Sequence, residues 1–289
     1  ISKRDNTMGL LLSSGCDVVT RDQLSMIPCV PKSDTHEPVK HIDFLESIEK
    51  GIERTGYIKI TGSEHGVSHD GERFFSFMDI VTKKTESANG HILDGDVKLQ
   101  IIARNANDMQ FKANISGGTT TMCCDNLAFW GNLMDFGHEN DRGQRRGRKH
   151  TANIHLEMPQ LLDDAFGRLV DQVDSFEARY RHYKGTPVSD RQMHDLVCRA
   201  LDATHEGREK KAVITTSFVY PVLKEWHDSQ FAEFRNEKNA WGAFSAFTSA
   251  GTKGTNRKPI PINEQAIRTQ NLHEIFDDFC DYGFNRIYN

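Results

Sequence analysis

The stretch "RFFSFMDIVT" at residues 73–82, together with "DVKLQIIARN" at 96–105, decides the fold class. Both runs are short and rich in β-branched and aromatic residues, which is typical of strands. Clusters of Gly, Asn, Asp and Ser separate them from similar runs, and "SGG" at 116–118 has the composition of a hairpin connection. Those other runs are "YIKITG" at 57–62, "MQFKANI" at 109–115 and "TTTMCC" at 119–124. Sequential strands with such short links predict an antiparallel meander of four to five strands.

Helical periodicity flanks this sheet region on both sides. Before it, apolar residues at three- and four-residue spacing predict one helix from Val39 to about Thr55, ended by Gly56. Directly after it, "CDNLAFWGNLMDFG" at 124–137 predicts a second helix with Asp125 or Asn126 as its N-cap. Four apolar residues of that stretch fall on one helical face: Leu127, Trp130, Leu133 and Met134.

The rest of the chain is predicted to be mostly helical. A long helix begins near Pro159 and carries a heptad-like apolar seam of Leu162, Phe166, Leu169, Val173, Phe176, Tyr180 and Tyr183. This seam either faces the core of one protomer or pairs two subunits, and its width favours the core. "SDRQ" at 189–192 has the capping-box form and opens another helix through Leu201. "NAWGAFSAFTSA" at 239–250 predicts a tightly packed helix, a final helix runs from Asn263 to about Tyr282, and "AVITTSFVYPVL" at 212–223 fits either a strand or a helix.

These elements predict an α+β fold, with an antiparallel β-meander preceded by one helix and followed by several helices. Residues 1–37 show no sustained period and are predicted to form an N-terminal arm with a short strand. Residues 38–289 are predicted to form a single α+β domain, sheet-rich over 57–124 and helix-rich over 125–289.

The composition excludes several classes of protein. No window approaches the roughly 18 consecutive apolar residues that a transmembrane helix needs. "MGLLL" at 8–12 is too short for the core of a signal peptide, so a cytoplasmic location is expected. The six cysteines form no C-x-x-C pair and do not resemble a disulfide framework, so we expect them to be small buried hydrophobes.

No familiar catalytic motif occurs in the chain. The dinucleotide-binding, P-loop and nucleophile-elbow patterns are all missing from the sequence. His65 and His69 have the spacing of two metal ligands on a helix, but the Gly and Asp residues around them predict a turn. Asp94, Asp96 and Asp108 could hold magnesium, although acids beside hairpins are more often turn formers. We therefore assign no catalytic residue, metal or cofactor, and an enzyme is the less favoured class.

One segment is strongly basic in a chain whose formal net charge is −5. "RGQRRGRKH" at 142–150 holds Arg142, Arg145, Arg146, Arg148 and Lys149 and no acid. With Glu139 and Asp141 counted, residues 138–150 carry +3, which leaves −8 for the remainder (−5 minus 3). Arginine suits bidentate phosphate contacts and base stacking. The run is either a nucleic-acid contact arm or a solvated loop that happens to be basic.

Aromatic residues of the strand region are candidate stacking platforms for bases. They are Tyr57, Phe74, Phe75, Phe77 and Phe111. Because side chains alternate across a strand and one face must fill a core, only some of them can serve in this way.

Four landmarks occur in order along the chain. They are an R-N-x-x-D turn on Arg104, Asn105 and Asp108, the "CDNLAF" run that begins with Cys124, Asp125 and Asn126, "KHT" at 149–151, and "WGAFSAFTSA" at 241–250, which begins with Trp241. In these landmarks the chain, over about residues 40–285, resembles the phage- and plasmid-borne family known as domain of unknown function number 932. Members usually carry a Ser-His pair where this chain has "NAND" at 105–108, so no role of that histidine carries over. The resemblance implies a mobile-element context in bacteria and no catalytic residues.

The leading hypothesis is a non-enzymatic phage or mobile-element protein in the cytoplasm of a bacterial host cell. It would form homo-oligomers and bind single-stranded or deformed DNA through residues 142–149, in recombination, replication or DNA protection. The order of sheet and helices is compatible with that of single-strand annealing recombinases, which is an analogy of fold alone. An alternative is a protein–protein effector that inhibits a host defence complex, with acidic residues such as Glu274, Asp277, Asp278 and Asp281 mimicking nucleic acid. A metal-dependent nuclease is the third hypothesis.

Overall fold

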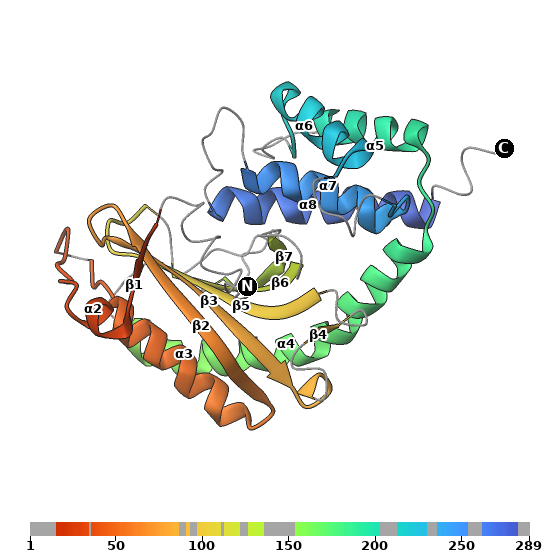
Figure 1. Ribbon diagram of the computed structural model, residues 1–289. Coiled ribbons are helices and arrows are strands. Elements are labelled where there is room, and N and C mark those ends of the chain that lie inside the picture. Colours follow the sequence, from red (N-terminus) through yellow and green to blue (C-terminus); the bar gives the residue numbers. More distant parts are fainter. Residues whose placement is uncertain are drawn as a thin grey trace, which may run out of the picture. The chain divides into compact units, whose positions relative to one another are not determined.

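A computed structural model of the chain describes residues 16–34, 36–86, 91–92, 97–110, 113–121, 127–135, 154–202, 213–229, 236–253 and 262–282 (Figure 1). The chain divides into two compact units. Unit 1 comprises Ile1–Thr119 and Gly131–Val173, and unit 2 comprises Thr120–Trp130 and Asp174–Asn289.

Antiparallel strands form one sheet in the order β1-β2-β3-β5-β6-β7, with β4 paired to β5. The described strands are β1 (Asp17–Val19), β2 (Ile58–Ser68), β3 (Arg73–Thr82), β4 (His91–Ile92), β5 (Val97–Ala106), β6 (Asn114–Thr121) and β7 (Leu127–Asp135). The pairs β1–β2, β2–β3 and β3–β5 are antiparallel. Strands β2, β3, β5, β6 and β7 therefore form a five-strand antiparallel meander, and the predicted α+β fold class is confirmed.

Two details of the predicted sheet are wrong. The stretch at 124–137 is not a helix, because Leu127–Asp135 forms β7, the last strand in the sheet order. A short apolar run fits one helical face and one strand almost equally well, and pairing with a neighbouring strand decides between them. "SGG" at 116–118 is not a hairpin connection, because it lies inside β6. Glycine adopts extended backbone as readily as a turn, so its presence alone did not settle the connection.

Helix α3 (His41–Thr55) lies along the sheet and packs on β2 and β5 (Figure 1). Its apolar face is buried, as predicted, and Gly56 ends it in the left-handed region with φ 67°. Gly51 allows helix α4 (Ile154–Gly185) to approach α3 closely. A Cβ at this position would lie 2.8 Å from Phe166 Cε2 and 3.3 Å from Leu162 Cβ, both on α4. The segment before α3, predicted as an arm, contains β1 and the short helix α2 (Arg21–Ser25).

Helix α4 (Ile154–Gly185) begins earlier than predicted, and Pro159 lies inside it. All the side chains of the predicted seam are buried: Leu162, Phe166, Leu169, Val173, Phe176, Tyr180 and Tyr183. The seam therefore faces the core of a single protomer, because buried side chains are not free to pair with a second subunit. Residues of α4 as far as Val173 belong to unit 1, and those from Asp174 belong to unit 2.

Unit 2 contains α5 (Asp190–Asp202), α6 (Thr216–His227), α7 (Ala240–Lys253) and α8 (Ile262–Tyr282). The capping box before α5 is confirmed, since Gln192 N donates to Ser189 Oγ at 3.3 Å and Ser189 N donates to Gln192 Oε1 at 2.9 Å. The ambiguous stretch at 212–223 is helical from Thr216. Among the helices in the described ranges, none is long and apolar enough to cross a membrane.

Helix α7 is packed as tightly as its small and aromatic residues predict, with every side chain from Ala240 to Ala250 buried. Asn239 caps it, because its Oδ1 accepts a hydrogen bond from Gly242 N at 2.9 Å. The chain before the cap folds back onto the first turn. A Cβ on Gly242 would lie only 2.0 Å from the carbonyl oxygen of Glu237, so only glycine fits this position.

Candidate functional site

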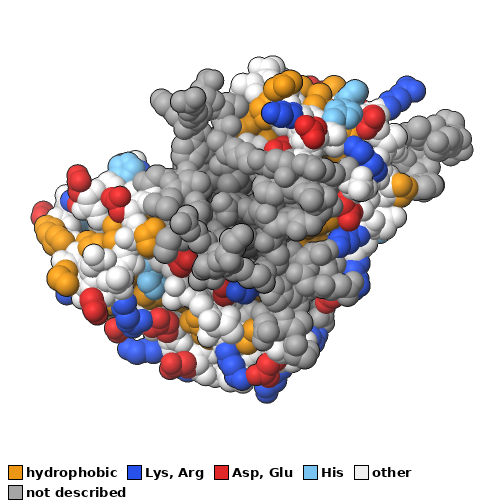
Figure 2. Space-filling view, in the orientation of Figure 1, with side chains coloured by type: hydrophobic (Ala, Val, Ile, Leu, Met, Phe, Trp, Pro, Cys, Tyr) orange, Lys and Arg blue, Asp and Glu red, His pale blue; other side chains and the backbone are white. Residues whose placement is uncertain are grey.

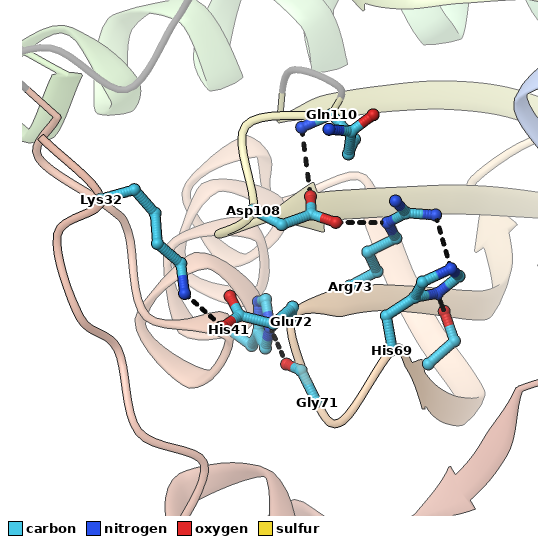
Figure 3. Close-up of polar contacts among 9 residues, drawn as sticks. Lys32, His41, His69, Gly71, Glu72, Arg73, Asp108 and Gln110 are labelled. Carbon is cyan, nitrogen blue, oxygen red and sulfur yellow. Dashed lines mark hydrogen bonds and ion pairs between the residues drawn. The ribbon is translucent and has the colours of Figure 1, made fainter.

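Sheet register brings the R-N-x-x-D motif at the end of β5 beside the turn between β2 and β3. Phe74 pairs with Asn105 and Arg73 pairs with Ala106. Past the strand ends, Asn107 N donates to Glu72 O at 2.8 Å. Five side chains gather here, and we call them the sheet-end cluster: His41, His69, Arg73, Asn105 and Asp108. Figure 3 shows four of them: His41, His69, Arg73 and Asp108.

Asn105 is the buried centre of the sheet-end cluster, with none of its surface exposed to solvent. Its Nδ2 donates to Val39 O at 2.8 Å and lies 3.0 Å from His41 Nδ1. A carbonyl can only accept, so these contacts fix which end of the amide is nitrogen. Within the described part of the chain, the Oδ1 of Asn105 has no hydrogen-bond partner. The motif asparagine therefore joins the start of α3 to the end of β5.

His41 is held neutral chiefly by its burial, and two hydrogen bonds fix which ring nitrogen carries the proton. Its Nε2 lies 2.8 Å from Gly71 O, so Nε2 carries the proton and Nδ1 accepts from Asn105. The ring stacks on Phe74, with centroids 5.5 Å apart. Burial lowers the pKa of His41 below its ordinary value, because the charged imidazolium loses its hydration. His41 thus links α3 to the β2–β3 turn as a fixed neutral tautomer.

The turn between β2 and β3 contains three residues with positive φ angles. His69, Asp70 and Gly71 are consecutive and left-handed, with φ 55°, 56° and 84°. Non-glycine residues in this region carry a conformational cost of roughly 1–3 kcal/mol each, so the surrounding contacts must maintain them. Two hydrogen bonds hold this turn. Glu72 N donates to His69 O at 3.0 Å, and His41 Nε2 donates to Gly71 O at 2.8 Å.

Arg73 lies between Asp108 and His69 (Figure 3). Its Nε donates to Asp108 Oδ2 at 2.7 Å, and its Nη1 donates to His69 Nε2 at 3.1 Å. Asp108 Oδ1 accepts from Gln110 N at 3.1 Å, so both carboxylate oxygens are engaged. Since an arginine only donates, His69 Nε2 is an acceptor and the Nδ1 proton points to Ser68 Oγ, 3.1 Å away.

This geometry does not support nucleophilic chemistry at the sheet-end cluster. A general base must direct a lone pair at the hydroxyl it activates, whereas His69 directs its N–H at Ser68. The metal pair considered from the sequence does not form either, because buried His65 bonds to Ser76 Oγ at 2.9 Å and His69 bonds to Arg73. Within the described ranges, no three His, Cys, Asp or Glu side chains converge as they stand on a point that could hold a metal ion. The sheet-end cluster instead fixes strand ends and a strained turn.

The other predicted site residues divide into three groups. Arg104 lies on the sheet face opposite Asn105 and is half-buried. Of the aromatic stacking candidates, Phe74, Phe75 and Phe77 are buried in the sheet and are not available to bases, whereas Tyr57 is half-buried. Residues outside the described part of the chain are Phe111, Asp94, Asp96, Cys124, Asp125, Asn126, Arg142, Arg145, Arg146, Arg148 and Lys149.

Trp241, the last predicted landmark residue, lies in an aromatic core of unit 2. It is 3% exposed, and its ring meets Tyr180 edge-on at a centroid distance of 4.8 Å. Nearby, Tyr183 Oη donates to Asp277 Oδ1 at 2.6 Å, and Arg179 Nη2 lies 3.1 Å from Asp277 Oδ2. Burial and the adjacent Asp277 carboxylate raise the pKa of Tyr183, so the hydroxyl stays protonated. The Trp241 landmark therefore marks a packed core.

His273 makes the stability of this core depend on pH. Its ring stacks on Phe244 with centroids 4.6 Å apart, and burial lowers its pKa to about 3, helped by the nearby Arg179 charge. An unfolded histidine titrates near pH 6.5, so between these values only the unfolded chain takes up the proton. Stability is therefore complete above pH 6.5 and falls as the pH drops toward 3. This group alone should change the unfolding equilibrium about tenfold per pH unit.

Chemical denaturation of wild type and His273→Gln at pH 7, 6 and 5 tests this dependence. We expect the free energy of unfolding to depend less steeply on pH in the variant than in the wild type. The difference in slope should correspond to the uptake of about one proton on unfolding. His182, which is exposed on α4, offers the matched control, and His182→Gln should keep the wild-type slope. An unchanged slope in His273→Gln would show that His273 is already charged or exposed in the folded protein.

Sequence reasoning found Asn105, Asp108 and Trp241, considered His69 only as a metal ligand in a turn, and missed His41 and Arg73. The missed residues lie far from the motif in sequence, and only the β2–β3–β5 register brings them to it. No local pattern marked His41, whereas the Gly and Asp residues around His69 did predict a turn.

The fold and the sheet-end cluster define an α+β protein in which polar landmark residues brace a meander sheet and an aromatic landmark fills a helical core. The chain belongs to the family described as Domain of unknown function (DUF932), whose model matches residues 31–273. This confirms the resemblance read from the landmarks. Searches of curated proteins and of solved structures give no match.

Proposed function

We propose that this protein binds nucleic acid without altering it chemically, and that residues 142–149 make the contact. The observation that carries the proposal is the concentration of positive charge in this segment. Arg142, Arg145, Arg146, Arg148 and Lys149 stand within eight residues, while the chain outside 138–150 has a formal charge of −8. Charge localised in this way favours a localised anionic partner.

The described surface supports this choice of segment, because many of its cations already contact carboxylates. Figure 2 shows Lys and Arg side chains interspersed with Asp and Glu side chains. Exposed ion pairs add little stability, but they leave little net positive charge for a phosphate backbone. The paired cations are Arg21, Lys32, Lys50, Arg54, Lys59, Arg73, Lys98, Arg179, Arg181 and Arg199.

The proposed ligand is single-stranded or deformed DNA, as met in recombination, replication or DNA protection. The guanidinium groups would each donate two parallel hydrogen bonds to successive phosphates of the backbone. Because Phe74, Phe75 and Phe77 are buried, base stacking on these rings does not contribute, and binding should tolerate many sequences. We further propose that several copies of the protein bind side by side along one DNA strand. Mass photometry that found only monomers, with and without DNA, would disprove this oligomerisation.

The other two hypotheses have less support. Of the acidic residues near the C-terminus, Asp277 is engaged by Tyr183 and Arg179, and Asp281 lies 3.4 Å from His182 Nε2. Two of the four acidic residues on which the mimicry hypothesis rests are therefore engaged within this chain, while Glu274 and Asp278 are exposed. The nuclease hypothesis relied in part on Asp108, whose two oxygens are taken by Arg73 and Gln110.

Fluorescence polarisation with a labelled single-stranded oligonucleotide tests the proposal. If all five basic side chains contact phosphates, the slope of log K against log salt should be roughly −3.5. Changing Arg142, Arg145, Arg146 and Arg148 to Gln should bring the slope to about −0.7. Between 50 and 200 mM salt, the wild type should lose affinity on the order of a hundredfold.

A matched control removes the same amount of charge elsewhere. Arg21, Lys50, Arg54 and Lys59 are exposed and ion-paired, and changing all four to Gln should leave the salt slope unchanged. The proposal fails if the wild type shows no salt-sensitive binding. It also fails if both fourfold variants weaken binding equally, because net charge rather than residues 142–149 would then be responsible.

A further inference from the structure

Helix α6 of unit 2 exposes an aromatic ring to solvent. One side of the helix packs on α5 and α7, and its side chains Phe218, Val222 and Trp226 are buried there. On the opposite side Tyr220 is 74% exposed. No other Phe, Tyr or Trp whose side chain the structure describes is exposed. The ring is therefore open to a partner, while the buried side holds the helix in place.

Three exposed polar side chains share the helix face of Tyr220. Thr216 and Lys224 are four residues from it and Ser217 is three residues from it, so each lies one helical turn away. We call these four residues the Tyr220 face. Ser217 Oγ lies 2.8 Å from the Oγ1 of Thr215, which precedes the helix, so hydroxyl groups gather at one end of this face. Lys224 supplies a positive charge at the other end.

The charge of the Tyr220 face is positive. Within the described ranges Lys224 forms no ion pair, unlike the cations that contact carboxylates elsewhere on the surface. The acid of α6 is Glu225, which is half-buried and whose Oε2 accepts from Ser229 Oγ at 3.4 Å. Asp228 is exposed but lies beyond the last residue of the helix. An anion can therefore approach the ring without displacing a carboxylate from this face.

We propose that the Tyr220 face binds single-stranded nucleic acid, with one base stacked on the Tyr220 ring. This role rests on the proposed function and adds to it a residue that contacts bases, whereas residues 142–149 contact phosphates. Exposed aromatic rings beside positive charge hold single strands with little sequence preference, because every base has a face that can stack. In a duplex the bases already stack on one another, and extracting one costs free energy. The Tyr220 face should therefore favour single strands over duplexes.

The polar groups around the ring suit the rest of a nucleotide. The hydroxyls of Thr216 and Ser217 can donate to phosphate or sugar oxygens. Pro221 lies inside α6 and has no N–H, so the carbonyl oxygen of Ser217 lacks the donor that the fourth following residue normally supplies in a helix. This oxygen, one turn from Tyr220, can accept from the amino group of a base. A stacked nucleotide thus meets a ring, two donors and an acceptor on one helix face.

Fluorescence polarisation with three labelled ligands of equal length tests the proposal. They are a single strand of mixed sequence, the same strand with abasic sugars throughout, and the duplex. Tyr220→Leu should bind the mixed strand about 5- to 150-fold more weakly than the wild type, which corresponds to the loss of one stacked base. It should bind the abasic strand and the duplex as the wild type does. Tyr220→Phe keeps the ring and should keep the wild-type affinity, and both variants should keep the salt slope because no charge changes.

Leu156→Ala is the matched control. It removes an apolar side chain that is 81% exposed on α4, and it should leave all three affinities unchanged. Circular dichroism checks that the variants are folded, which is expected because both positions are exposed.

Two outcomes overturn the role of Tyr220 alone. In the first, the wild type binds with the expected salt dependence and Tyr220→Leu binds the mixed strand equally well. In the second, Tyr220→Leu loses as much affinity for the abasic strand as for the mixed strand, because the ring would then contact no base. If the wild type binds no nucleic acid at all, the proposed function and the role of Tyr220 are both overturned.

Discussion

Gly242→Ala should destabilise the protein by about 3 kcal/mol or more, the largest effect we expect from a single methyl group. The new Cβ would lie 2.0 Å from the carbonyl oxygen of Glu237 and 2.9 Å from its Cβ. The obstacle is backbone, so no flexible side chain can move aside. The backbone must shift instead, and that shift would break the cap in which Asn239 accepts from Gly242 N. Urea denaturation followed by circular dichroism measures the loss.

Gly167→Ala is the matched control for this prediction. Gly167 lies inside α4, and a Cβ there would meet no atom within 4 Å. Alanine is the better helix former, so this variant should gain about 0.5–1 kcal/mol. If Gly242→Ala were as stable as the wild type, the segment around Glu237 would have to move away from α7 at no cost. The explanation that only glycine fits at position 242 would then be wrong.

Asn105→Asp should cost about 3 kcal/mol or more, although it replaces only one NH₂ group by oxygen. Asn105 Nδ2 donates to Val39 O and to His41 Nδ1, and an ionised carboxylate can donate to neither. The substitution also places a negative charge at a position with no solvent exposure. Burial raises the pKa of such a carboxyl, and its protonated form can donate again. The deficit relative to wild type should therefore shrink as the pH falls.

Denaturation of wild type and Asn105→Asp at two pH values measures this deficit. Asn236, which is exposed, supplies the matched change, and Asn236→Asp should shift stability by less than about 0.5 kcal/mol at either pH. A deficit that stayed constant with pH would mean that the new carboxyl is not buried. The Asn105 side chain would then have to move away from Val39 in the variant.

The fold could be predicted from the sequence wherever a local pattern agreed with the tertiary structure. "RFFSFMDIVT" became β3 with the predicted bounds, and the Ser189–Gln192 capping box formed as expected. The prediction failed at β7, where four apolar residues within eight positions suit a helical face, but the residues join the sheet. Short segments of this kind are decided by the available partner strand, which the local sequence does not encode.

The sheet-end cluster could be predicted only in part, for a physical reason. Asn105 and Asp108 belong to one short motif, so they could be recognised together. Their partners His41 and Arg73 come from other elements, and the contacts among them depend on strand register. A one-residue slip of β3 against β5 would turn these side chains to opposite faces, and no local pattern contains that information.

Helix α4 has a consequence for how the gene can be divided. Val173 and the seam residues before it lie in unit 1, whereas Phe176, Tyr180 and Tyr183 complete the buried core of unit 2. A stop codon after the sheet would remove the helix that covers Gly51, and a start codon placed after residue 173 would give a helical half without its first turns. Split-gene complementation should succeed only at breaks outside 154–185.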